Sequence, residues 1–303
     1  MNPNRCRRQA GARNDSGAPA CKRGEKNMLE HDALEKQLRD SNQKRSRQRM
    51  KYMMLAVASV CVFLFIWQMI VISGVINVRN LPAPTQVFKA FITKLTSKSP
   101  DGNTLGMNIL ASLQVSLTGF FAALIIGVPL GLLMGWFEPV DRFVRPVFEL
   151  IRPIPPIAWI PVVVIFMGIG IQAKATIIFL AVFVSCVINA YTGIRMTDKT
   201  LINVAKTFGA GNVETFVKIG IPSAMPMVFA GIRVSLGSAW STLVAAEMLA
   251  AHAGLGYMLQ TGRNVGKAEI VVLAMVTIAA LGAMMSGLLT LVERHVLKWK
   301  MTR

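Results

Sequence analysis

Acidic residues are scarce in this sequence, and so are the residues that build catalytic and metal sites. Its 303 residues include 15 Asp and Glu against 33 Lys and Arg, and the three histidines are scattered and form no Ser/His/Asp set. The four cysteines have no metal-like spacing, and two of them fall inside apolar segments. We therefore predict no metal site, no disulfide and no hydrolytic triad.

A phosphate-binding loop is also missing. The pattern GxxxxGK[ST], whose backbone N–H groups cradle nucleotide phosphates, occurs nowhere in the chain. We expect a protein that is not itself an enzyme, does not hydrolyse ATP and needs no cofactor of its own.

Apolar residues are what the chain has in abundance. They make up 53% of it, and the mean hydropathy of +0.50 is too high for one soluble domain. The formal charge of +18 does not indicate a nucleic-acid-binding face, because 14 of the 33 Lys and Arg lie in residues 1–51, where six acids accompany them. The predicted fold class is all-α, a polytopic membrane protein that contacts lipid and not nucleic acid.

Two parts of the chain differ in composition. Residues 1–50 are predicted to form a basic cytoplasmic arm. Residues 1–27 have too little apolar area to repay the entropy of ordering and are expected to be disordered. Residues 28–51 have a helix-friendly composition with a dense basic end, which predicts a solvated helix near anionic headgroups. Residues 51–303 are predicted to form the transmembrane domain.

Six apolar segments have the length that a hydrocarbon core of ~30 Å requires at 1.5 Å per residue. They are Tyr52–Ile76, Ile109–Phe137, Arg152–Gly170, Ala175–Ile194, Ser223–Ala246 and Ile270–Val292. The third carries Pro153, Pro155, Pro156 and Pro161. Prolines remove backbone donors, which lipid tolerates only where protein or a water-filled cavity satisfies the freed carbonyls. We predict that this span is broken and faces the interior.

The distribution of Lys and Arg sets the orientation. The N-terminal arm, residues 138–153 and 195–222 and the C-terminus together hold 25 of them, and the opposite set of loops holds 7. By the positive-inside rule, both termini are expected to be cytoplasmic.

The polar interval Thr197–Pro222, here called the coupling loop, reads as a helix-turn-helix. Leu201, Val204, Ala205 and Phe208 recur at i, i+3, i+4 and i+7, which predicts one amphipathic helix. Asp198 is its expected N-cap and Gly209 its end; Asn212 is expected to cap a second helix that Pro222 terminates. Such a loop either packs on its own protein or docks a soluble partner.

The coupling loop resembles the cytoplasmic "EAA" loop of binding-protein-dependent ABC importer permeases, which reads Glu-Ala-Ala, three residues, Gly, nine residues, Ile-x-Leu-Pro. The chain departs from this pattern at Asn203 and Val204. The resemblance implies that an ATP-binding subunit docks on the loop. The residues it assigns to this coupling are Asn203, Ala205, Phe208, Gly209, Ile219 and Pro222.

A few polar residues within or beside the spans are candidates for a translocation path. Glu247 either faces the path or caps and pairs locally. Arg233, at mid-membrane depth, needs a partner, which is a carboxylate, helix-end carbonyls or a substrate anion. His252 either faces substrate or is solvated.

Two tryptophans and two hydroxyl residues complete the candidate path. The tryptophans either line the path or anchor span ends in the aromatic belt. The residues are Trp159, Trp240, Ser241 and Thr242.

Three stretches together look like the nitrate/sulfonate/taurine branch of these permeases: RPIPPIAWIPVVVIFMGIG, the coupling loop and AAEMLAAHAGLGYML, the last two most like taurine and aliphatic-sulfonate members. The resemblance implies an inner-membrane permease dimer on two ATP-binding subunits, served by an extracytoplasmic substrate-binding protein. The substrate expected is taurine or another sulfonate, with nitrate as the alternative. A gradient-driven secondary carrier and a membrane scaffold are the hypotheses from other classes.

Overall fold

The computed structural model describes residues 48–296 except 49, 57, 75–80 and 250. Most of the predicted basic arm therefore lies outside the described residues. The chain divides into two units, Met1–Met69 and Ile70–Arg303. The first contributes most of the apolar helix Met50–Ile72, and everything below concerns the second.

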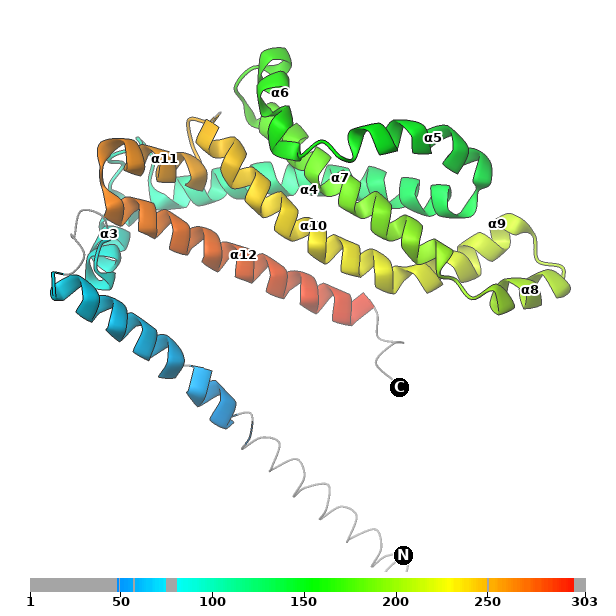
Figure 1. The fold of residues 1–303 in the computed structure, drawn as a ribbon, viewed down its shortest axis with the longest axis horizontal. Coiled ribbons are helices and arrows are strands. Elements are labelled where there is room, and N and C mark those ends of the chain that lie inside the picture. Colours follow the sequence, from blue (N-terminus) through cyan, green and yellow to red (C-terminus); the bar gives the residue numbers. More distant parts are fainter. Residues whose placement is uncertain (1–47, 49, 57, 75–80, 250, 297–303) are drawn as a thin grey trace, which may run out of the picture. The chain divides into compact units, whose positions relative to one another are not determined.

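The second unit is built of helices, and its described residues contain no strand (Figure 1). The elements are α3 (Pro84–Thr96), α4 (Leu105–Trp136), α5 (Glu138–Ile151), the 3₁₀ turn η1 (Pro156–Trp159), α6 (Ile160–Met167), α7 (Ile171–Arg195), α8 (Lys199–Thr207), α9 (Asn212–Thr215), the π turn η2 (Phe216–Gly220), α10 (Ile221–Leu249), α11 (Leu255–Val265) and α12 (Ala268–Val296). The all-α polytopic class is confirmed.

Five helices are long and apolar enough to cross a membrane, and a bent helix pair makes a sixth span if it counts as one. The predicted boundaries hold within a few residues for α7 and α12. The second span begins earlier than predicted, at Leu105, because the Thr104 side chain accepts a hydrogen bond from the Met107 N–H and caps the helix there.

The third span was predicted with the wrong start. The break at the prolines is present, but α6 has only 8 residues, or about 12 Å at 1.5 Å per residue, which is too short to cross the bilayer. Residues 138–151, read from their charges as a loop, form α5, which meets the η1–α6 segment at 81°. The charges sit on a helix because they pair along it, Arg142 with Glu138 and Arg145 with Asp141.

Glycines let α4 and α7 pack at close range. A Cβ on Gly119 would lie 2.5 Å from the Ala175 carbonyl oxygen, and one on Gly131 would lie 2.5 Å from that of Val187. Close backbone approach of this kind is how helices associate in lipid, where no hydrophobic effect drives them together. α10 packs on the same pair through Leu236, Ala239 and Leu243, so the three helices form the centre of the unit.

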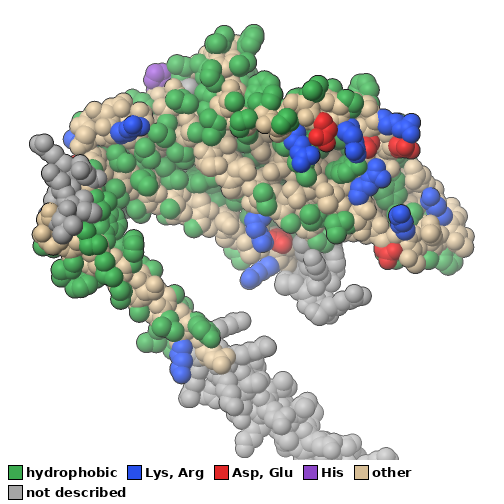
Figure 2. Space-filling model, viewed as in Figure 1, with side chains coloured by type: hydrophobic (Ala, Val, Ile, Leu, Met, Phe, Trp, Pro, Cys, Tyr) green, Lys and Arg blue, Asp and Glu red, His purple; other side chains and the backbone are tan. Residues whose placement is uncertain are grey.

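The two ends of this centre differ. The coupling loop, α8 and α9, projects from one end of α10, and α11 lies at the other (Figure 1). Figure 2 shows charged side chains gathered over α5, α8 and α9 and near the end of α12, with few over the rest of the face in view, where many side chains are hydrophobic. The end that carries the coupling loop is thus the basic end that the sequence assigns to the cytoplasm.

Candidate functional site

The first half of the coupling loop forms as predicted. The Asp198 carboxylate accepts the Thr200 N–H at 2.8 Å and caps α8, and Gly209 ends the turn with φ of +82°. No residue of α8 is buried, and Leu201, Val204 and Phe208 expose 50%, 48% and 86% of their surface. An amphipathic helix that leaves its apolar face open has a surface for a partner.

The second half differs from the prediction. Asn212 is the first residue of α9 and not its cap, and its side-chain oxygen accepts the Trp136 indole N–H at 3.1 Å. Pro222 does not end the helix: α9, the π turn and α10 run on as one helix, Asn212–Leu249. Pro222 falls in the first turn of α10, directly after a π turn that already interrupts the regular hydrogen-bond ladder, so its missing N–H costs little.

Aromatic side chains pack the coupling loop against the end of α4. The Phe216 ring lies 5.5 Å from that of Trp136 and 5.4 Å from that of Phe137. Gly220 lies against Trp136, since a Cβ there would be 2.9 Å from the indole ring. The loop is therefore fixed to the spans on one side and open on the other. Of the predicted coupling residues, Asn203, Phe208, Gly209 and Pro222 are exposed, and Ala205 and Ile219 are half-buried.

Asp198→Ala is expected to loosen the start of α8. The hydrogen bond from Thr200 lowers the pKa of Asp198, so the cap is fully formed above the ordinary Asp pKa and is lost as the pH falls through the lowered value. Amide exchange at Thr200, corrected for the intrinsic rate, should accelerate about fivefold in Asp198→Ala. Asp198→Asn keeps a capping oxygen and should stay near wild type; equal acceleration in both variants would contradict the assignment.

Three predicted path residues line one cavity. It has a volume of about 330 Å³, lies between α7, α10 and the broken segment, and has Trp159, Ser241 and Thr242 in its wall. We call it the α7–α10 cavity. The prolines that break the third span, Pro155 and Pro156, line it as well. The expectation that the broken backbone borders a cavity agrees with this arrangement.

Sequence reasoning missed three polar residues of this cavity, Arg152, Ser185 and Ser238. Ser238 lies one helical turn before Ser241, a spacing that puts both hydroxyls on one face of α10 and could have revealed it. Ser185 comes from α7 and carries no local signal. Arg152 sits at the break, where its guanidinium lies 3.6 Å from the Glu149 carboxylate, and the positive-inside count treated it only as a topology marker.

Trp240 and Arg233 line a different cavity, of about 480 Å³ between α10 and α12, whose wall also includes Ser241. The Trp240 indole donates to the Ile278 carbonyl at 3.0 Å and so ties α10 to α12. Arg233 pairs with Glu293 of α12. Of the partners considered for this arginine, the structure provides the carboxylate.

Exchanging the two charges tests the Arg233 pair. Arg233→Glu places two carboxylates side by side and should lower the yield of folded protein severalfold, since a charge left unpaired in a span is costly. The double variant Arg233→Glu with Glu293→Arg should recover most of it. The yield is measured by size-exclusion chromatography of detergent-solubilised protein. If the double variant gave as little folded protein as the single one, the ion pair with Glu293 would not be the reason that Arg233 stabilises the fold.

Glu247 and His252 line neither of these two cavities. Glu247 is fully buried and lines neither of the two cavities; Ser112 and the Gly256 N–H donate to its carboxylate. This arrangement agrees with the local-capping alternative, since the carboxylate is bound by the start of α11 and by Ser112. His252 is exposed in the turn before α11, where its carbonyl oxygen accepts from Asn103.

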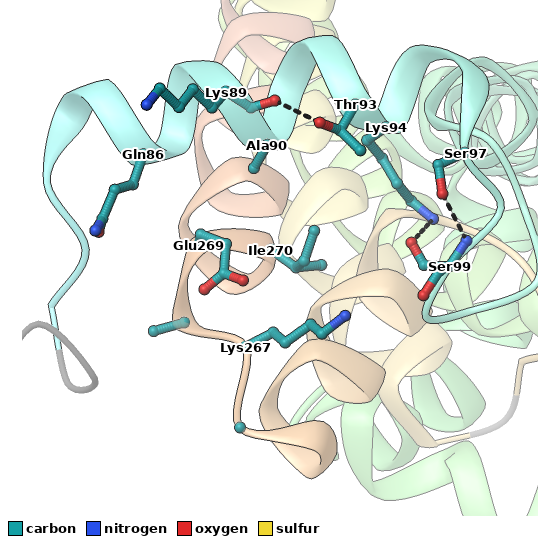
Figure 3. Close-up of a pocket in the computed structure, with 12 residues that line it drawn as sticks. Gln86, Lys89, Ala90, Thr93, Lys94, Ser97, Ser99, Lys267, Glu269 and Ile270 are labelled. Carbon is teal, nitrogen blue, oxygen red and sulfur yellow. Dashed lines mark hydrogen bonds between the residues drawn. The ribbon is translucent and has the colours of Figure 1, made fainter.

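A third cavity, of about 660 Å³, lies between α3 and the start of α12 and holds none of the predicted path residues (Figure 3). Lys94 borders it, but Figure 3 shows its side chain reaching toward Ser99, whose carbonyl oxygen is 3.0 Å from the ammonium. The same ammonium pairs with Asp101. Its charge is thus satisfied by the α3–α4 loop.

Long apolar helices, with an exposed amphipathic loop at the basic end, are the features of a polytopic membrane protein. Residues 127–298 match the model of the family described as binding-protein-dependent transport system inner membrane component. The chain belongs to this family. It is an inner-membrane transport permease and not an enzyme.

Individual relatives agree with this assignment. The chain is 36% identical over 77% of its length to a probable ABC transporter permease protein of Brucella abortus, covering 90% of that protein. It is 32% identical to the taurine transport system permease protein TauC of Escherichia coli, over 81% of this chain and 89% of that one. A nitrate import permease protein, NrtB of Synechocystis, is 30% identical over 78% and 86% of the two chains.

The fold also matches a solved transporter. A chain of the MetNI methionine ABC transporter, in an inward-facing conformation, superposes with a TM-score of 0.55 at 19% identity, and the match covers 63% of this chain and 95% of that one. The likeness concerns the fold.

Proposed function

We propose that this permease imports a small organic sulfonate, taurine or a close analogue, through the α7–α10 cavity. The observation that carries the proposal is that Trp159, Ser241 and Thr242 border one cavity with Arg152 and two further serines. The E. coli relative named for taurine supports the same substrate class.

The lining fits the chemistry of a sulfonate. Its three oxygens are acceptors that share one negative charge, and Arg152 lines the cavity together with hydroxyl residues of α7 and α10. The Ser238 and Ser241 hydroxyls donate to carbonyls of α10 here and would turn to donate to a bound sulfonate. The aliphatic part of the substrate then meets Ile154, Ile157 and the Trp159 ring. Nitrate, the alternative substrate, is planar and has no apolar part, so it would leave those contacts unused.

ATP is hydrolysed, in this proposal, by separate subunits that dock on the coupling loop. The open apolar face of α8, centred on Phe208, supplies the contact, and the coupling loop is placed in the cytoplasm, where ATP is. Two copies of the permease form the membrane dimer, each with one coupling loop, and an extracytoplasmic binding protein delivers the substrate to the opposite end.

The unbroken helix from Asn212 to Leu249 gives the coupling a mechanical route. Its first turns belong to the coupling loop and its middle carries Ser238, Ser241 and Thr242. The helix continues between them through the π turn and Pro226. A displacement of the coupling loop by the ATP-binding subunits therefore reaches the cavity wall along one continuous helix. Alternating access needs only two packings of this helix that the ligands stabilise unequally.

Competition against uptake of labelled taurine tests the substrate. The system is a vesicle that holds the chain with its ATP-binding subunit and is supplied with its binding protein and internal ATP. Unlabelled taurine and a short alkanesulfonate should suppress uptake, and nitrate should not. Suppression by nitrate with no effect of sulfonates would overturn the sulfonate assignment in favour of a small inorganic anion.

A further inference from the structure

The sequence Gly254-Leu255-Gly256 opens α11, and each of its three N–H groups is bound by a side chain from another helix. Gly254 donates to the Asn108 side-chain oxygen at 3.1 Å, Leu255 to the Ser112 hydroxyl at 2.9 Å and Gly256 to a Glu247 carboxylate oxygen at 2.9 Å. These are the donors that a helix start leaves without intrahelical partners. Asn108 and Ser112 come from α4, and Glu247 comes from α10.

The three side chains form one buried network. Asn108, Ser112 and Glu247 each have 0% of their surface exposed. The Ser112 hydroxyl lies 2.8 Å and 2.9 Å from the two carboxylate oxygens, which share its one proton, while it accepts from the Leu255 N–H. A buried carboxylate bound by a hydroxyl and by the positive end of a helix is stabilised there, and removing it leaves buried donors unpaired.

Both glycines are needed for this contact. Gly254 has φ of +127°, and a Cβ on it would lie 2.3 Å from a carboxylate oxygen of Glu247. A Cβ on Gly256 would lie 2.6 Å from the Val244 carbonyl oxygen of α10. The start of α11 thus wraps closely around the last turns of α10, which accounts for the glycine pair that the transport function leaves unexplained.

The network also reaches α3. The Asn108 amide donates to Asp101 at 2.6 Å, and Asp101 pairs with Lys94 of α3. Below the polar layer, Leu255 and Met258 of α11 pack with apolar residues of α3, α4 and α12. Glu247 therefore joins α10 to a cluster of residues from α3, α4, α11 and α12, at the end of the unit opposite the coupling loop.

We propose that Glu247 is a positioning residue of the transport cycle, which fixes α11 to the end of α10 so that the two move as one body when the cavity changes the side to which it opens. Glu247 lies five residues beyond Thr242 on the same helix, so motion of the cavity wall reaches it directly. The inference rests on the proposed function only in taking α10 as the element that moves.

The distance between the two helices is the direct test. Nitroxide labels are placed on cysteines substituted for Leu249 and Val265, both exposed, in a chain that lacks the four native cysteines and is assembled with its ATP-binding subunit. The distance distribution should be the same without nucleotide and with bound ATP. In Glu247→Gln, which removes the negative charge beside the start of α11 and leaves one accepting oxygen where two accept from Ser112 and Gly256, it should broaden and differ between the two states.

A second readout separates positioning from mere folding. ATP hydrolysed per substrate imported should rise about tenfold in Glu247→Gln, the scale of a lost hydrogen bond to a buried charge. A purely structural role would lower the amount of folded complex and leave this ratio unchanged. Ser112→Ala, which keeps the carboxylate and its bond to Gly256, should show the same change to a smaller extent and serves if Glu247→Gln does not fold. Glu269→Gln, an acid removed from the start of α12, is the matched control.

Two results would overturn the proposal: a wild-type label distance that shifts by several ångströms on ATP binding, or an unchanged ATP-to-substrate ratio in both network variants. The label measurement needs no transport substrate. Failure of the wild-type complex to import any sulfonate would therefore contradict the proposed function without touching this inference.

Discussion

Gly209→Arg is expected to abolish ATP-driven uptake, by a factor of a hundred or more on the scale of a few kcal/mol at an interface, while the chain still folds. Gly209 is exposed, has φ of +82°, and no atom lies within 4 Å of the Cβ that a substitution would add. A non-glycine residue in this conformation costs roughly 1–2 kcal/mol locally. The arginine side chain would stand out from the turn beside Phe208, on the face assigned to the ATP-binding subunit.

Gly209→Asn separates backbone strain from obstruction of docking. Asparagine tolerates the left-handed conformation and adds a short side chain, so uptake should stay within a few-fold of wild type. Both variants are compared for folded yield, for uptake and for co-purification of the ATP-binding subunit. Normal uptake by Gly209→Arg, with normal ATPase stimulation, would contradict the docking role of the coupling loop.

Ser241→Phe should reduce uptake at least tenfold, an estimate based on the cost of losing a well-fitted ligand contact. Ser241 borders both the α7–α10 cavity and the cavity between α10 and α12, and a phenyl ring there would occupy space that a substrate needs. ATP hydrolysis without substrate should continue, because the docking surface lies at the far end of the helix.

Two control variants separate loss of the hydroxyl from the added bulk and from the position of the ring. Ser241→Ala removes one hydroxyl without adding bulk and should mainly raise the KM for uptake. Ile125→Phe puts the same ring on α4 at a position with 72% exposure that lines neither cavity, and should leave uptake near wild type. Equal uptake by Ser241→Phe and Ile125→Phe would show that substrate does not pass Ser241.

The parts of the molecule that could be predicted from the sequence are those with local causes. Asp198 caps α8 and Gly209 ends its turn because both effects act within a few residues. The break at Pro155 and Pro156 likewise follows from missing donors in one segment. Periodicity and length placed the spans, since a bilayer imposes a minimum run of apolar residues.

The parts that could not be predicted depend on contacts between distant residues. Glu247 meets Ser112 across 135 positions, and nothing near either residue indicates the pairing. Arg233 finds Glu293 across 60 positions. Helix α5 was read as a loop because its charges were counted for topology, whereas their spacing pairs them along a helix.

Pro222 does not end its helix, although proline normally does. The π turn at Phe216–Gly220 directly precedes it and already interrupts the regular hydrogen-bond pattern, so the helix continues into the span. As a result, the coupling loop and the wall of the α7–α10 cavity share one continuous helix.

Energy coupling is the central claim, and vesicle uptake with and without internal ATP tests it most directly. Vesicles that hold the chain and its ATP-binding subunit, supplied with binding protein and labelled taurine, should accumulate label only when ATP is enclosed and the binding protein is present, and dissipating the proton gradient should leave uptake unchanged. Uptake that persists without ATP and collapses with the proton gradient would contradict the account and identify a gradient-driven carrier.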